Sequence, residues 1–436
     1  MSLAVGTIGS LVLIAAILSG ANVMVALALV GAIGLAIIGD FNVATALMGS
    51  VFFDTTHSFN FSVIPMFLLM GFFAMRAGLG QDMFDAATKW LGGLRGGLAI
   101  STTIGAAAFG AAAGSSVGSA TIFTRLALPE MLARGYDKRL ASASIAISGT
   151  LAVMIPPSAL MVVYGILTDT SIGGLLLAGV IPGFTFAFIL CFATYLWVRI
   201  YPESAPQMVE RFTMREKMAS LRLVGPLLLV IVVIILGLYL GFFTPTEAGG
   251  VGALVTLILA AIRHRGLKGV ELTETLLDTV KTSGMIFAII IAAILFSKFL
   301  AFSGVTHALG GFLTGLETNR WVIVGFIVLI YLVLGMLMDA PGLLAITLPI
   351  THPVMLGLGF DEIWVGVFVV LLCELGAVTP PVGINCFVVQ AASEGRVELD
   401  EVFRGLTPFF LAGLVMLVLL CLFPEIATFL PDTMKQ

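Results

Sequence analysis

The chain has 436 residues, of which 59% are hydrophobic and only 11% charged, and its formal net charge at pH 7 is -4. A soluble protein needs a charged, hydrated exterior, so this composition excludes an ordinary soluble domain and indicates a membrane protein. The sequence shows no basic patch, and we expect no nucleic-acid partner. The four cysteines lie singly in apolar runs, without the spacing of metal ligands.

Apolar runs begin at the N-terminus, where Ser2–Leu18 lacks a signal-peptide cleavage pattern and is predicted to remain as a first membrane helix. Other runs that span a bilayer, wholly or in part, include Leu223–Leu240 and Trp321–Met338. Gln81–Leu94 and Gly304–Leu316 are short and amphipathic, and we expect them in the inner and outer membrane interfaces. The chain is therefore predicted to be an all-α polytopic protein of the lipid bilayer.

Three clusters of positive charge, at 134–139, 211–222 and 263–268, set the expected orientation. Short loops rich in lysine and arginine stay in the cytoplasm, so we expect all three clusters there. The polar stretch 201–222 is then a cytoplasmic linker between two halves, 1–200 and 223–436. Counting spans away from these loops places both termini on the outer side of the membrane.

The two halves contain an internal repeat. Pro129–Asp137 resembles Pro353–Asp361, which lies 224 residues later, and the same offset places Pro156-Pro157 on Pro380-Pro381. The predicted orientation puts the first loop inside and the second outside, so the halves form inverted repeats. Inverted repeats are typical of secondary transporters. Convergent turn chemistry is the alternative for the loops, but it does not explain the matching prolines.

Each half also contains a short polar interruption about 40 residues before its proline pair, at Gly114–Thr121 and at Asp339–Gly342. The apolar flanks, roughly 15 residues each, are too short to span a bilayer comfortably. They predict two re-entrant helical hairpins, at about 97–136 and 321–360, whose tips end near the midplane.

The proline pairs are predicted to break the helices 138–167 and 362–392, because proline removes a backbone donor and frees carbonyl groups. A bound cation is one partner for such carbonyls, and a kink repaired by neighbouring helices is the alternative. A hard cation such as sodium prefers carbonyl, hydroxyl and carboxylate oxygens. Asp339 and Glu374 are candidates because a carboxylate within the membrane is costly, although a buried structural acceptor remains the alternative.

The candidate site residues therefore gather at the two tips and the two breaks. The sodium candidates are Gly114, Ser115, Ser116, Thr150, Pro156, Asp339, Gly342, Glu374, Thr379 and Pro380. An organic anion is held by helix N-termini, hydroxyls and amides, or by a cationic side chain. The anion candidates are Ser116, Ser158, Lys298, Asp339, Gly383 and Asn385. Snorkelling toward the interface is the alternative for Lys298.

Together the motifs resemble the large membrane subunit of TRAP (tripartite ATP-independent periplasmic) transporters. That family typically carries a Gly-Ser-Ser tip, a Pro-x-Met hairpin return, an Ile-Pro-Pro-Ser break, a Phe-Thr-Pro-Thr-Glu-Ala segment and a Thr-Pro-Pro-Val-Gly break. The same motifs occur here, in order, at Gly114–Ser116, Pro129–Asp137, Ile155–Ser158, Phe243–Ala248 and Thr379–Gly383. The first tip departs from the family, which more often has Ala-Thr where Gly118-Ser119 stands, and this leaves individual ligands there open.

The resemblance implies the fold of the ion transporter superfamily, in which a mobile transport domain moves against a rigid scaffold as an elevator. It implies sodium-driven uptake of a small carboxylate across the bacterial inner membrane. The termini, which the charge pattern places on the outer side, are then expected in the periplasm. A periplasmic binding protein would deliver the substrate. A small four-helix membrane subunit would pair with this chain, and we expect it as a separate chain because none precedes Met1.

Three rival readings stay open at this point. A single-component, sodium-coupled di- or tricarboxylate carrier of the same superfamily would share the inverted hairpins. A membrane enzyme is disfavoured because the histidines (His57, His264, His307 and His352) are scattered and no Ser/His/Asp constellation is visible. A channel is disfavoured because inverted, broken helices fit alternating access better than a continuous pore.

Overall fold

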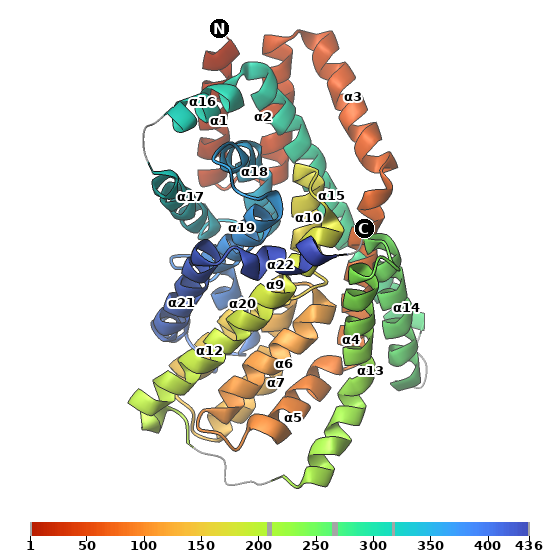
Figure 1. Ribbon diagram of the computed structural model, residues 1–436, viewed down its shortest axis with the longest axis vertical. Coiled ribbons are helices and arrows are strands. Elements are labelled where there is room, and N and C mark those ends of the chain that lie inside the picture. Colours follow the sequence, from red (N-terminus) through yellow and green to blue (C-terminus); the bar gives the residue numbers. More distant parts are fainter. Residues whose placement is uncertain (1, 207–211, 264–268, 316–318, 435–436) are drawn as a thin grey trace.

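The computed structural model describes residues 2–206, 212–263, 269–315 and 319–434, and these are almost entirely helical (Figure 1). Seven of the described helices are long and apolar enough to cross a membrane, or eight if one bent pair counts as a single span. The prediction of an all-α polytopic membrane protein is confirmed. Parts of the second and third basic clusters, His264 and the last residue of the predicted outer interfacial helix lie outside the described residues.

The first half runs through scaffold helices, a short amphipathic helix, a hairpin and a broken helix. Its elements are α1 (Ser2–Leu18), α2 (Val23–Ile38), α3 (Phe41–His57), η1 (Phe59–Ser62), α4 (Val63–Arg76), α5 (Leu79–Leu91), α6 (Gly97–Ala113), α7 (Ser116–Ala133), α8 (Lys138–Gly149), α9 (Leu151–Met154), α10 (Ala159–Thr168), α11 (Ile172–Ala178), α12 (Val180–Ile200) and η2 (Pro202–Ser204).

The second half follows the same order. Its elements are α13 (Met214–Tyr239), α14 (Pro245–Arg263), α15 (Gly269–Ser303), α16 (Val305–Gly315), α17 (Arg320–Gly335), α18 (Ala340–Gly357), α19 (Glu362–Gly376), α20 (Ile384–Ala392), α21 (Leu399–Leu422) and α22 (Glu425–Thr433). The stretch predicted as a linker, 201–222, is helical from Met214 onward. The cause is a capping box, in which Thr213 and Glu216 satisfy each other's backbone N–H groups and start a helix early.

The two amphipathic helices brace one hairpin each, which supports the inverted arrangement. α5 packs against α6 and α13, whereas α16 packs against α18 and α15. In Figure 1 they lie toward opposite ends of the molecule. α5 is anchored to the scaffold through Trp90, whose indole N–H donates to the Lys217 carbonyl at 3.2 Å. The Lys217 ammonium also lies 5.7 Å from the Trp90 ring centroid.

The base of the first hairpin is fixed by Asp137, which caps α8 by accepting the Arg139 backbone N–H at 2.7 Å. The Arg139 guanidinium also bonds this carboxylate, and it holds the pKa of Asp137 below its usual range. The loop between α7 and α8 therefore stays ordered at the foot of the hairpin.

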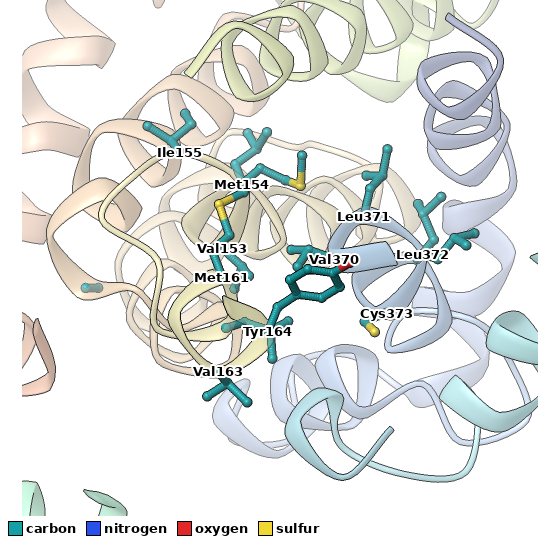
Figure 2. Packing of buried hydrophobic residues seen from close by; sticks show 14 of the residues in the cluster. Val153, Met154, Ile155, Met161, Val163, Tyr164, Val370, Leu371, Leu372 and Cys373 are labelled. Atoms are coloured by element: carbon teal, nitrogen blue, oxygen red, sulfur yellow. The ribbon is translucent and has the colours of Figure 1, made fainter. Parts of the chain in front are cut away.

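One buried hydrophobic core extends through the molecule, and part of it lies where the two broken helices meet. Figure 2 shows Met154, Met161 and Tyr164, from the first broken helix, facing Val370 and Leu371 of α19. Small residues of α6 allow the backbones to approach closely, since a Cβ added at Gly110 would lie 2.5 Å from the Ala152 Cα atom. Such small-residue contacts are how membrane helices pack without a hydrophobic driving force. The hairpins and breaks thus form one packed unit.

Candidate ion and substrate site

The first hairpin tip is the two-residue turn between α6 and α7. Gly114 adopts a left-handed conformation, with φ of 60°, which a residue with a side chain rarely adopts. Ser115 then caps α7 by accepting the Gly118 backbone N–H at 3.2 Å. The tip meets the first break directly, since a Cβ added at Gly114 would lie 3.3 Å from the Pro157 carbonyl oxygen.

The first break separates α9 from α10 and bends the span by 49°. The Pro156-Pro157 bond is cis, and the buried Ser158 caps α10 by accepting the Met161 N–H at 3.2 Å. Thr150 donates its hydroxyl hydrogen to the Ile147 carbonyl at 2.6 Å, which leaves the oxygen lone pairs free. The structure therefore brings Gly114, Ser115, Pro156 and Ser158 to one place.

The second hairpin tip lies between α17 and α18, and Asp339 occupies the N-cap position of α18. Its carboxylate makes no capping hydrogen bond, and it points past Gly342, where an added Cβ would lie 2.8 Å from Asp339 Oδ1. The side chain is exposed. A carboxylate that is not used to cap its own helix remains available to a ligand.

The second break separates α19 from α20 and contains the cis Pro380-Pro381 bond. Gly383, with φ of 58°, turns the chain so that the Asn385 N–H donates to the Ala377 carbonyl at 3.1 Å. The Thr379 hydroxyl donates to the Leu375 carbonyl at 2.5 Å. The tip and the break of this half are joined through Gly335, where an added Cβ would lie 2.8 Å from the Gly376 Cα atom.

A hydrogen bond at the first tip crosses between the two halves. The Ser116 hydroxyl, at the first tip, donates to Glu374 Oε1 at 3.3 Å, although the residues are 258 positions apart. Glu374 is 1% exposed, and its second carboxylate oxygen has no hydrogen-bond partner among the described residues. A buried acid with an unmatched oxygen is costly unless a proton or a cation neutralises it.

Asn385, on α20, is a second buried polar residue whose side chain lacks hydrogen-bond partners among the described residues, and its helix packs against α7. Its side chain is fully buried, and neither its oxygen nor its nitrogen has a partner within the described part of the chain. The oxygen of Ser119, on the helix that packs against α20, is likewise buried and unpartnered. Native interiors rarely leave such groups unsatisfied, so these atoms indicate a place for a ligand or water.

Lys298 lies apart from the other predicted residues. It lines a cavity of about 1030 Å³ between α3, η1, the α10–α11 turn, the α13–α14 turn and α15. This cavity lies on the side that the charge pattern predicts to be outer, and it is called the outer cavity. Lys298 also lines a smaller cavity of about 100 Å³ that reaches Leu348 and Pro349 of α18. No other residue predicted for the site lines either cavity. The structure therefore places Lys298 at an approach to the hairpins and not at a tip.

Sequence reasoning did not single out two further polar contacts. In the first, the Tyr164 hydroxyl lies 2.9 Å from His352 Nδ1 and joins α10 to α18 across the two halves.

The second contact is at the start of α14, in the Phe-Thr-Pro-Thr-Glu-Ala motif. The Glu247 carboxylate accepts the Thr244 N–H at 2.9 Å, and the Glu247 N–H donates to the Thr244 hydroxyl oxygen. The Thr-x-x-Glu spacing was the available signal for this capping box.

Two helical hairpins, two broken helices and inverted halves define the class: a membrane transporter built from inverted repeats. The model of the family described as tripartite ATP-independent periplasmic transporter, DctM component, matches residues 10–426. The chain belongs to this family of multi-pass membrane proteins. Its members are one component of a tripartite transporter, and the resemblance drawn from the motifs is confirmed.

Individual relatives agree with this membership. The C4-dicarboxylate TRAP transporter large permease protein DctM of Pseudomonas aeruginosa is 33% identical over 380 residues, which are 87% of this chain and 88% of that protein. The sialic acid TRAP transporter large permease protein SiaM of Vibrio cholerae is 28% identical over 375 residues, 86% of this chain and 87% of that protein.

The fold also resembles that of a solved structure. The crystal structure of the YdaH transporter of Alcanivorax borkumensis aligns with a TM-score of 0.67 at 14% sequence identity, over 96% of this chain and 98% of that one. At this identity the likeness supports the fold alone.

Proposed function

We propose that this chain is the large permease of a sodium-coupled TRAP transporter that imports a small organic acid by an elevator movement. The observation that carries the proposal is the pairing of each hairpin tip with a broken helix, which brings carbonyl, hydroxyl and carboxylate oxygens together inside an apolar protein. Oxygen ligands of this kind suit sodium, and broken-helix ends suit an anionic substrate.

The relatives named for C4-dicarboxylates and for sialic acid indicate the substrate class, since both substrates carry carboxylates. Ser116, Ser158, Asp339, Gly383 and Asn385 are the proposed contacts near the tips and breaks. Lys298 is proposed to meet the carboxylate in the outer cavity, before the substrate reaches the tips.

The partners follow from the tripartite family. We propose a separate four-helix membrane subunit, which completes the scaffold, and a periplasmic binding protein, which delivers the substrate to the outer cavity. The proposed location is the bacterial inner membrane, with both termini in the periplasm.

Reconstitution in proteoliposomes tests the proposal. This chain and the small subunit are placed in the liposomes, and the binding protein is added with a radiolabelled carboxylate bound. We expect uptake only when all three proteins are present and an inward sodium gradient is applied. Replacing external sodium with potassium, at the same ionic strength, is the control. Uptake by this chain alone would instead favour the single-component carrier. Uptake without sodium would show that sodium is not the coupling ion.

A further inference from the structure

The two tip sites differ in charge, although they are related by the repeat. At the 224-residue offset, Ser115 of the first tip corresponds to Asp339 of the second. The second tip thus carries its own carboxylate. The first tip offers neutral oxygens only, from backbone carbonyls, Ser115, Ser116 and Thr150. A cation placed among neutral groups away from water lacks a counter-charge, and this arrangement is unfavourable in a low-dielectric interior.

The same offset places Thr150, before the first break, on Glu374, before the second. Glu374 is the fully buried acid that accepts the Ser116 hydroxyl hydrogen at 3.3 Å. Ala340 stands where Ser116 would correspond and has no hydroxyl, so the second tip cannot repeat the hydrogen bond from Ser116 to Glu374. This particular link between a tip and the opposite break therefore occurs in one direction only among the described residues.

We infer that Glu374 supplies the counter-charge for the cation at the first hairpin tip, across the boundary between the two repeats. Ser116 makes the connection because a hydroxyl that donates its hydrogen to a carboxylate keeps both oxygen lone pairs for a cation. Each of the two tip sites then has one carboxylate, Asp339 or Glu374, and both acids come from the second half. The inference rests on the proposed sodium coupling.

The surroundings of Glu374 agree with this role. Its second oxygen is buried without a partner among the described residues, and so are both side-chain polar atoms of Asn385 on α20, a helix that packs against α7. These atoms have hydrogen-bonding capacity that the protein itself does not use. Asn385 follows the break that begins a few residues after Glu374, and its backbone N–H is tied back to Ala377. The carboxylate, the hydroxyl and the amide therefore come from three different elements, α19, α7 and α20, that meet only in the folded protein.

Sodium binding without substrate tests the inference. The purified complex of this chain with its small subunit would be titrated with radiolabelled sodium in a scintillation proximity assay, with choline chloride holding the ionic strength constant. We expect about two ions per wild-type chain. Glu374→Gln keeps a hydrogen-bond acceptor for Ser116 but loses the charge, and it should weaken one of the two sites by about tenfold or more.

Ser116→Ala provides a second variant, which keeps the carboxylate and removes the connecting hydroxyl; it should weaken the same single site. Glu362→Gln, at the exposed start of α19, is the matched control for loss of one negative charge and should bind as wild type. Size-exclusion chromatography of each complex confirms folding.

The outcomes separate the two proposals. A wild-type isotherm for both Glu374→Gln and Ser116→Ala overturns the inference and leaves sodium coupling intact. Unchanged sodium binding together with a changed pH dependence of uptake would also overturn it, because Glu374 would then carry a proton. If the wild-type complex binds no sodium, the proposed sodium coupling is wrong, and the inference about Glu374 is wrong with it.

Discussion

Asp339 is the residue on which the second tip depends. Its carboxylate lies beside Gly342 in the first turn of α18, makes no capping hydrogen bond there, and belongs to an exposed residue. In a tip that ends within the membrane, such a charge is costly and is expected to serve a function. The amide of asparagine has nearly the same size and shape but no charge. The exchange of these two side chains therefore isolates the charge from the packing.

We predict that Asp339→Asn abolishes sodium-dependent uptake, by at least about a hundredfold, because the site loses the only formal charge that its own tip provides. Uptake into proteoliposomes with the full complex measures this, and the amount of folded protein should stay at the wild-type level. Full uptake by the variant would remove Asp339 from the site.

Single residues also show where sequence reasoning reaches its limit. Composition and spacing identify Ser116 and Glu374 separately, because polar groups stand out in apolar runs. Their contact joins positions 258 residues apart and depends on how the two halves pack, which one sequence does not encode in a readable pattern. Lys298 shows the same limit, since its place in the outer cavity depends on several elements that are far apart in the sequence. The ligand assignments themselves stay predictions.

At the scale of elements, the sequence predicts much more. Apolar length identifies α1 at its observed bounds, and short apolar arms around a polar turn identify both hairpins. The proline pairs identify both breaks because proline acts locally on the backbone. The start of α13 was not predicted, because the apolar run alone does not reveal the polar first turns of this helix. The Thr213–Glu216 capping box stabilises its start.

The orientation of the two hairpins is the element-scale prediction. Lys138 and Glu362 are exposed, correspond at the 224-residue offset and lie at the feet of the first and second hairpins. Cysteine at each position avoids the neighbouring Gly135 and Gly359, whose φ values of 79° and 80° would strain any side chain.

We expect a membrane-impermeant maleimide, applied to intact cells, to label Glu362→Cys from the outside and to reach Lys138→Cys only after permeabilisation. The parent protein is the control, since its own cysteines lie within the membrane helices. Labelling of both variants from the same side would contradict the inverted arrangement.

For the whole molecule, we propose that the outer cavity separates a scaffold from the moving unit that carries the hairpins. Gly173, after the α10–α11 turn, approaches the scaffold closely there, since an added Cβ would lie 3.8 Å from Pro245 Cγ. The Pro245 Cβ atom lies one bond from this Cγ atom, so the two positions are neighbours. A pair of cysteines there can be tested for the Cβ–Cβ distance of about 3.5–4.5 Å that a disulfide requires. An elevator movement would have to separate them.

We predict that Gly173→Cys combined with Pro245→Cys stops uptake after oxidation and that a reducing agent restores it. Each single variant, treated in the same way, should transport normally. Uptake at the wild-type rate by fully cross-linked protein would mean that these two surfaces do not move apart during transport.

The two acids at the tips, Asp339 and Glu374, also have an electrical consequence under the proposed mechanism. When both cations leave, the moving unit carries two uncompensated negative charges. Moving one charge across the whole membrane potential changes its energy by about 2.3 kcal/mol per 100 mV, and a partial movement changes it in proportion, so an inside-negative potential pushes the empty unit outward. The return of the empty carrier would then be the step that responds to voltage. The resting potential of the cell would reset the transporter between cycles, without any ATP bound to the protein.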